Sequence, residues 1–137
     1  MIDTNLLQKA FEAALSARTN AHAPYSNFQV GAALVDIEGN IYSGCNVENA
    51  SFGATVCAER TALLSSVAQK GKLKYQFIVV VCNTDPVTVP CALCLQVLSE
   101  FVAGDFPVYL ANLKEIKREV RFRDLLPMPF NTLDKQK

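Results

Sequence analysis

Apolar residues near the start of the chain recur every three to four positions, which is the spacing of one helix face. The stripe consists of Leu6, Leu7, Ala10, Phe11, Ala14 and Leu15. Asp3 is suited to cap such a helix, and the run 21–24 ends it, because Pro24 disfavours helical backbone in the residue before it. The pattern therefore predicts a helix that begins after Asp3 and fades near residue 21.

The rest of the chain alternates between short apolar runs and longer amphipathic stretches. Strands are predicted at 28–36, 41–47, 77–82 and 106–112, with a tight turn at 38–40 that makes the first two a hairpin. Helices are predicted at 57–71 and 91–104, ending at Gly71 and Gly104, and a short strand or helix at 119–126. The order of these elements predicts an α/β fold: a three-layer α/β/α sandwich around one mixed sheet, with 1–137 as a single domain and a frayed tail at 131–137.

Charge and hydropathy narrow the class of protein. The 137 residues carry 13 Lys or Arg and 13 Asp or Glu, so the formal net charge is zero. Polynucleotide binders usually carry a basic excess, so we expect a small neutral substrate and no nucleic acid. No apolar run has the length of a membrane span, and the first residues do not resemble a signal peptide. The expected location is the cytoplasm.

Two cysteine motifs carry the strongest chemical signal. Cys57-Ala58-Glu59 stands at the start of one predicted helix, and Cys91 and Cys94 stand three apart at the start of another. Three thiolates fill three corners of a zinc tetrahedron and leave the fourth for water, as in catalytic zinc sites. Glu59 follows two residues after Cys57, where a general acid/base is needed.

Other interpretations of these cysteines stay open at this point. Cys45 and Cys82 bring the total to five, an odd number that argues against a disulfide scaffold in a reducing compartment. Either could supply a fourth ligand to a structural zinc site, although each lies within a predicted strand. A redox C-x-x-C pair would leave Cys57-Ala58-Glu59 unexplained, and buried inert cysteines are the remaining alternative.

Several further motifs support a family resemblance. Besides CAER (57–60) and PCALC (90–94), the chain has YSNFQVGAALV (25–35), GCNVENASFG (44–53), QVLSEF (96–101) and LLP (125–127). In this order the motifs resemble the small, homotetrameric, zinc-dependent cytidine deaminases, almost from end to end. Three cysteine ligands with a glutamate that does not bind the metal are a known signature of zinc deaminases.

The resemblance implies an activity and a cofactor. The activity is hydrolytic deamination of cytidine and deoxycytidine to uridine and deoxyuridine with release of ammonia, in pyrimidine salvage. The cofactor is one Zn²⁺ per chain, and the assembly is a homotetramer. A deaminase of a related cytidine-like compound and a non-catalytic, zinc-stabilised binding protein are the alternatives.

The resemblance also implies a role for each matching residue. The zinc ligands are Cys57, Cys91 and Cys94, and Glu59 is the proton shuttle. Substrate-binding positions are Phe28, Asn46, Glu48 and Ala58, where Asn46 and Glu48 match the pair that binds the ribose 3′-hydroxyl. Arg60 is expected to bind the zinc thiolates, and Phe52 and Phe130 to complete a neighbouring subunit's pocket. Peptide groups near Val89 and Pro90 are expected to contact the substrate amino group.

The chain departs from the family pattern at three positions. Leu95 stands where the family usually has Arg, Ala92 where it has Gly, and Phe52 where it has Tyr. None of these changes removes a ligand or the proposed shuttle. His22, the single histidine, lies far from the cysteine motifs and is expected to be structural.

Overall fold

The computed structural model describes residues 2–131, and the expected frayed tail lies outside them except for Asn131. Its helices are α1 (Thr4–Arg18), α2 (Ala58–Lys70), α3 (Ala92–Leu98) and α4 (Phe122–Leu125), with a 3-10 turn, η1, at Phe52–Ala54. Its strands are β1 (Val30–Asp36), β2 (Ile41–Cys45), β3 (Tyr75–Cys82), β4 (Pro107–Ala111) and β5 (Ile116–Arg121). Asp3 caps α1, since its carboxylate accepts the Asn5 N–H at 2.8 Å.

The five strands form one mixed sheet in the order β2-β1-β3-β4-β5. Strand β1 runs antiparallel to β2 and β3, β3 runs parallel to β4, and β4 runs antiparallel to β5. The parallel pair needs a long connection, and the 83–106 segment that contains α3 supplies it. The predicted mixed α/β sheet is confirmed.

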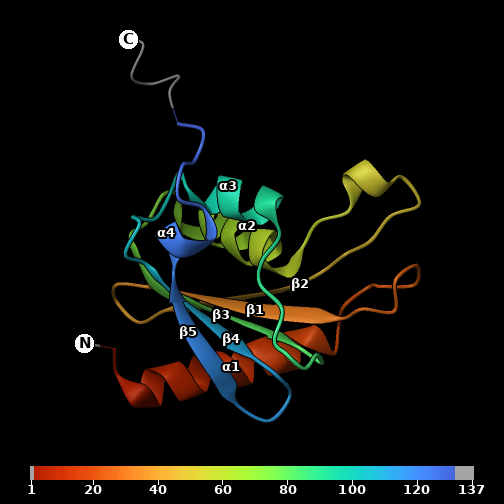
Figure 1. The fold of residues 1–137 in the computed structure, drawn as a ribbon, viewed down its shortest axis with the longest axis horizontal. Coiled ribbons are helices and arrows are strands. Elements are labelled where there is room, and N and C mark those ends of the chain that lie inside the picture. The colour runs from red at the N-terminus through yellow and green to blue at the C-terminus, as the bar shows by residue number, and fades with distance from the viewer. Residues whose placement is uncertain (1, 132–137) are drawn as a thin grey trace.

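Helices cover the sheet on both faces, as Figure 1 shows, with α1 on one side and α2 and α3 on the other. Alternate residues of a strand point to opposite faces, so β1 sends Ala33 and Val35 toward α1 but Ala32 and Leu34 toward α2. Two apolar cores result, one on each face. Within residues 2–131, no helix has both the length and the apolar character that crossing a bilayer requires.

Close packing of β2 against α2 fixes where α2 begins. A Cβ atom added at Gly44 would lie 2.7 Å from the carbonyl oxygen of Ala58 and closer still to the backbone nitrogen of Ala62. Only glycine allows this approach. At the other end of α2, Gly71 has φ +73°, which favours glycine and agrees with the predicted helix end.

Two predicted elements differ from the structure. The helix expected over 91–104 ends at Leu98, where the Ser99 hydroxyl donates to the Gln96 carbonyl oxygen at 2.5 Å and the chain turns. The prediction of an end at Gly104 is therefore wrong. The segment 119–126, predicted as a strand or a helix, contains both, since β5 ends at Arg121 and α4 begins at Phe122.

Candidate metal centre and adjoining pocket

Three cysteine sulfurs meet where α2 and α3 begin. Cys57 and Cys91 are the N-cap residues of α2 and α3, and Cys94 lies in the first turn of α3. Their Sγ atoms all lie within 4.8 Å of one another, with 3.7 Å between Cys57 and Cys91 and 3.6 Å between Cys91 and Cys94. Tetrahedral zinc with Zn–S bonds of about 2.3 Å separates its sulfurs by about 3.8 Å, which agrees with the distances from Cys91 to the other two sulfurs.

The charge state of the cluster also favours a cation. Hydrogen bonding from the Cys94 thiol, together with the Arg60 guanidinium and the Cys91 thiol, lowers the pKa of Cys57 to about 5. The same contact with Cys57, together with burial, raises the pKa of Cys94. Cys57 is therefore favoured as a thiolate that accepts a hydrogen bond from Cys94, and the thiolate is the form of cysteine that binds metal.

The other two cysteines lie outside this cluster. Cys45 ends β2 and Cys82 ends β3, and the metal-ligand group found among residues 2–131 contains neither of them. The interpretation as a structural site with four cysteines therefore has no support in the described residues. Three sulfurs leave a fourth coordination position free for water or substrate.

Glu59 lies beside the cluster in the first turn of α2. Its side chain is 4% exposed, and burial raises the pKa of its carboxyl to about 7. A carboxyl group with a pKa near neutrality both accepts and donates protons at physiological pH, which is what a general acid/base requires.

A cavity of about 310 Å³ opens next to Glu59. It brings together the sequence-predicted positions Phe28, Asn46, Glu48, Ala58, Val89, Cys57 and Cys91. Its remaining walls come from Ser26, Val30, Thr55, Val80 and Thr88, which the sequence did not single out, and from Cys82, which the sequence offered only as an alternative zinc ligand. Most of these are small or apolar residues in strands and loops, where nothing in the local pattern separates a pocket wall from ordinary core.

Asn46 and Glu48 are tied to the segment that carries Phe28. The Asn46 amide accepts the Val30 N–H at 2.9 Å and donates to the Phe28 carbonyl at 2.7 Å. The Glu48 carboxylate accepts the N–H groups of Tyr25 and Ser26 at 3.0 and 3.1 Å. The two residues predicted to bind the substrate therefore also shape the wall that faces it.

Phe52 and Phe130 do not line this cavity. Phe52 is 79% exposed on η1, in the yellow loop that projects from the body in Figure 1, and borders a neighbouring hollow of about 350 Å³. Phe130 is 61% exposed, and Met128 near it is 89% exposed. The predicted role of these aromatic residues in another subunit's pocket stays a prediction.

Three other sequence-predicted positions have clear surroundings. Arg60 donates from Nη2 to Cys57 Sγ at 3.6 Å and to the Thr55 carbonyl at 3.4 Å. Leu95 is 5% exposed and packs in the core beneath α3. The main chain of His22 pairs with that of the 46–48 segment, donating to the Asn46 carbonyl at 3.0 Å and accepting the Glu48 N–H at 2.8 Å, which agrees with a structural role.

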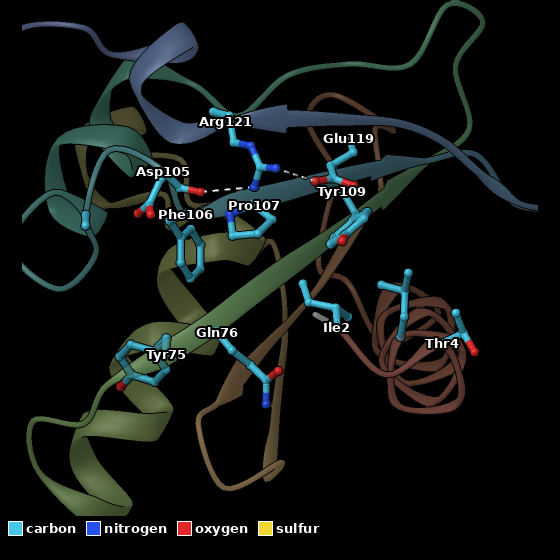
Figure 2. Close-up of a pocket in the computed structure, with 12 residues that line it drawn as sticks. Ile2, Thr4, Tyr75, Gln76, Asp105, Phe106, Pro107, Tyr109, Glu119 and Arg121 are labelled. Atoms are coloured by element: carbon cyan, nitrogen blue, oxygen red, sulfur yellow. Dashed lines mark hydrogen bonds and ion pairs between the residues drawn. The ribbon is translucent and has the colours of Figure 1, made fainter.

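A larger cavity, of about 660 Å³, lies elsewhere, between the start of α1 and strands β3, β4 and β5 (Figure 2). Arg121 occupies its rim, donating to the Asp105 carbonyl at 3.1 Å and lying 3.4 Å from the Glu119 carboxylate. The residues that line it include no cysteine or histidine, whereas the smaller cavity contains two of the three clustered cysteines and Glu59. The smaller cavity is therefore the candidate active site, because its lining residues, and not its volume, offer metal ligands and a general acid/base.

Comparison with known proteins points to the same chemistry. A family model for the "cytidine and deoxycytidylate deaminase zinc-binding region" matches residues 4–110. A cytidine deaminase of Sporosarcina psychrophila is 42% identical over 128 residues, covering 93% of each chain. A cytidine deaminase of Halalkalibacterium halodurans is 42% identical over 127 residues, covering 93% of this chain and 96% of the relative.

Solved structures resemble the fold over nearly its whole length. The crystal structure of a cytidine deaminase from Burkholderia pseudomallei has a TM-score of 0.84 and 45% identity, covering 90% of this chain and 98% of its own. One from Mycobacterium tuberculosis has a TM-score of 0.79 and 33% identity, covering 96% of this chain and 99% of its own.

Proposed function

This chain belongs to the cytidine and deoxycytidylate deaminase zinc-binding family, and we propose that it acts on free nucleosides at the pocket beside Glu59. The reaction is the zinc-dependent hydrolysis of cytidine and deoxycytidine, which gives uridine or deoxyuridine and ammonia. The single observation that carries the assignment to this pocket is that two cysteines of the three-sulfur cluster and the buried carboxyl of Glu59 line the same small cavity.

Cys57, Cys91 and Cys94 would hold the zinc ion, one per chain. Bound zinc makes a water molecule nucleophilic near neutral pH. Glu59 transfers the protons. Its carboxylate takes a proton from the attacking water and gives it to N3 of the cytosine ring, while the water oxygen bonds to C4. Glu59 then takes the second water proton from the new hydroxyl on C4 and passes it to the amino group, which leaves as ammonia while C4 becomes a carbonyl.

The other walls of the pocket would bind and orient the nucleoside. Phe28 would face the ring, and the main chain at Ala58 and Val89 lies where ring substituents would approach. Asn46 and Glu48 would hold the ribose through its 3′-hydroxyl, which cytidine and deoxycytidine share. No Lys or Arg is among the described residues that line the cavity, which favours an uncharged nucleoside over a nucleotide.

The proposal extends to the setting of the reaction. We assign the reaction to pyrimidine salvage in the cytoplasm. The five free cysteines of the protein are consistent with a reducing compartment. Residues 1–137 would form one domain and assemble as a homotetramer. Phe52, Met128 and Phe130 are large apolar residues that a single chain leaves exposed, and burying them in an interface would favour association.

Metal analysis combined with a cytidine assay tests this function. The protein as purified should contain one zinc per chain and convert cytidine to uridine, and Cys91→Ala should lose both properties. Cys45→Ser, a cysteine variant outside the cluster, should keep both. Zinc without turnover of cytidine would favour the non-catalytic alternative, and turnover of another cytosine compound alone would favour a different substrate.

A further inference from the structure

The hydroxyl of Ser26 connects two residues that the proposed function places on different parts of the nucleoside. It donates to Oε2 of Glu48, the residue proposed to bind the ribose. The same oxygen accepts the backbone N–H of Phe28, the residue proposed to face the base, at 3.0 Å. A hydroxyl has one proton and two acceptor positions, so it can make both bonds at once.

Hydrogen bonds from Tyr25 and Ser26 occupy most of the acceptor positions of the Glu48 carboxylate. Oε1 accepts the N–H groups of Tyr25 and Ser26, and Oε2 accepts the Ser26 hydroxyl. A carboxylate offers about four acceptor positions, so about one remains, on Oε2. These hydrogen bonds, with that of the Ser26 hydroxyl the largest, lower the pKa of Glu48 below its usual range, which keeps the group ionised.

The backbone between Ser26 and Phe28 is shaped to allow the connection. Asn27 has φ +57°, in the left-handed region that asparagine tolerates better than most residues, and its N–H donates to the Ala23 carbonyl at 3.0 Å. The Phe28 carbonyl is held by the Asn46 amide on the other side. The main chain of Phe28 is thus fixed at both its N–H and its carbonyl.

We propose that Ser26 is a positioning residue that sets the one remaining acceptor site of Glu48 relative to Phe28, and so determines how strongly the enzyme requires a 3′-hydroxyl. This inference rests on the proposed function. Ser26 lines the cavity and the adjoining hollow, as Glu48 does, so it stands where the two spaces meet. Without its hydroxyl, Glu48 loses the bond that orients Oε2, and the Phe28 N–H loses its acceptor.

The test compares cytidine with 3′-deoxycytidine for the parent and three variants. In Ser26→Ala, the KM for cytidine should rise about tenfold with a smaller change in kcat, since a hydrogen bond to a charged group is lost while Glu59 and the cysteines are untouched. Turnover of 3′-deoxycytidine should change much less, so discrimination between the two substrates should shrink. Ser26→Thr, which keeps the hydroxyl, should restore discrimination. Ser43→Ala, on an exposed part of β2 outside the pocket lining, should match the parent.

Failure of the positioning role of Ser26 and failure of the proposed deaminase function give different results in this experiment. If the parent converts cytidine but Ser26→Ala keeps its KM and its discrimination, the positioning role is refuted and the function stands. If Ser26→Ala slows both substrates equally, Ser26 is only part of the local structure and the inference also fails. If the parent does not convert cytidine at all, both the proposed function and the positioning role of Ser26 are refuted.

Discussion

The guanidinium of Arg60 lies 3.6 Å from the sulfur of Cys57, one turn earlier at the start of α2. Its Nε is buried without a hydrogen-bond partner among residues 2–131, whereas its Nη2 donates to the Cys57 sulfur and the Thr55 carbonyl, which places the guanidinium at the edge of the sulfur cluster. Three thiolates and one Zn²⁺ together carry a net charge of −1, and a cationic donor to a sulfur offsets that excess.

Arg60→Gln should therefore weaken zinc retention or lower kcat/KM by about 10- to 100-fold, the usual range for losing a partner of a metal ligand. Zinc content after dialysis against a chelator, together with the cytidine assay, measures both. Arg123→Gln, an exposed arginine of α4, is the control and should match the parent. If Arg60→Gln matches it too, the contact with Cys57 has no role in holding or tuning the metal.

Leu95 stands at the position where the family resemblance implies a second arginine near the metal. Leu95 is buried in the apolar core, so an arginine introduced there would need to bury a charge. We therefore expect Leu95→Arg to destabilise the fold and not to compensate for the loss of Arg60.

Cytidine 5′-monophosphate should be a poor substrate. The described residues that line the pocket include the carboxylates of Glu48 and Glu59 but no Lys or Arg, and a phosphate brought near them meets like charge. We expect its kcat/KM to be at least about 100-fold below that of cytidine, with deoxycytidine as the control that remains a good substrate. Efficient deamination of the monophosphate would show that the pocket accepts nucleotides.

Phe130 is held at its backbone while its side chain points outward. Gln96, on the same helix as Cys94, donates to the Phe130 carbonyl at 2.8 Å and accepts its N–H at 3.1 Å. If the exposed ring completes a neighbouring subunit's pocket, the protein should be a tetramer by light scattering and Phe130→Ala should lose activity. Ile37→Ala, equally exposed at 61% on the turn after β1, should not. A fully active monomer would overturn this arrangement.

Stability should fall in acid partly through Asp36. Burial raises the pKa of this carboxyl, but hydrogen bonds from Asn40, Tyr42 and Glu38 outweigh it and lower the pKa below its usual value. The stability this gives is therefore fully present above the unfolded-state pKa of about 3.9 and is lost as the pH falls through the lower folded-state value.

Thermal unfolding of Asp36→Asn tests this linkage. The variant should have a lower Tm than the parent at neutral pH, and the difference should narrow below about pH 4. Asp105→Asn, at an exposed carboxyl, serves as the control. A Tm difference that stays constant with pH would mean that Asp36 contributes through its shape and not its charge.

The sequence predicted the sulfur cluster well because its signal is local. Cys91 and Cys94 are spaced for one helical turn, and Cys57 with Glu59 marks a second helix start. The sheet likewise followed from periodic apolar runs. Asn46 and Glu48, whose roles came only from the family resemblance, line the cavity, but nothing in their local pattern predicted this.

Features set by distant contacts were not predictable in this way. Ser26 and Glu48 are 22 residues apart, and nothing near either one indicates that they bind each other. After Leu98 the backbone hydrogen bonds join residues three apart, from Glu100 to Val97 and from Phe101 to Leu98, and the spacing of apolar residues does not report this change. In the sequence, Leu95 is a departure from the arginine that the family resemblance implies. In the fold, Leu95 is part of the apolar core.

The deamination rate of zinc-loaded Glu59→Gln measures whether Glu59 is the proton carrier of the reaction. Glutamine has nearly the same shape, so the variant should fold, bind one zinc per chain and still bind uridine. Because it cannot move protons between water, N3 and the leaving amine, its kcat for cytidine should fall by ~10²–10⁴-fold, the usual effect of losing a general acid/base. A zinc-loaded Glu59→Gln that releases ammonia from cytidine at the parent rate would show that Glu59 is not the proton carrier.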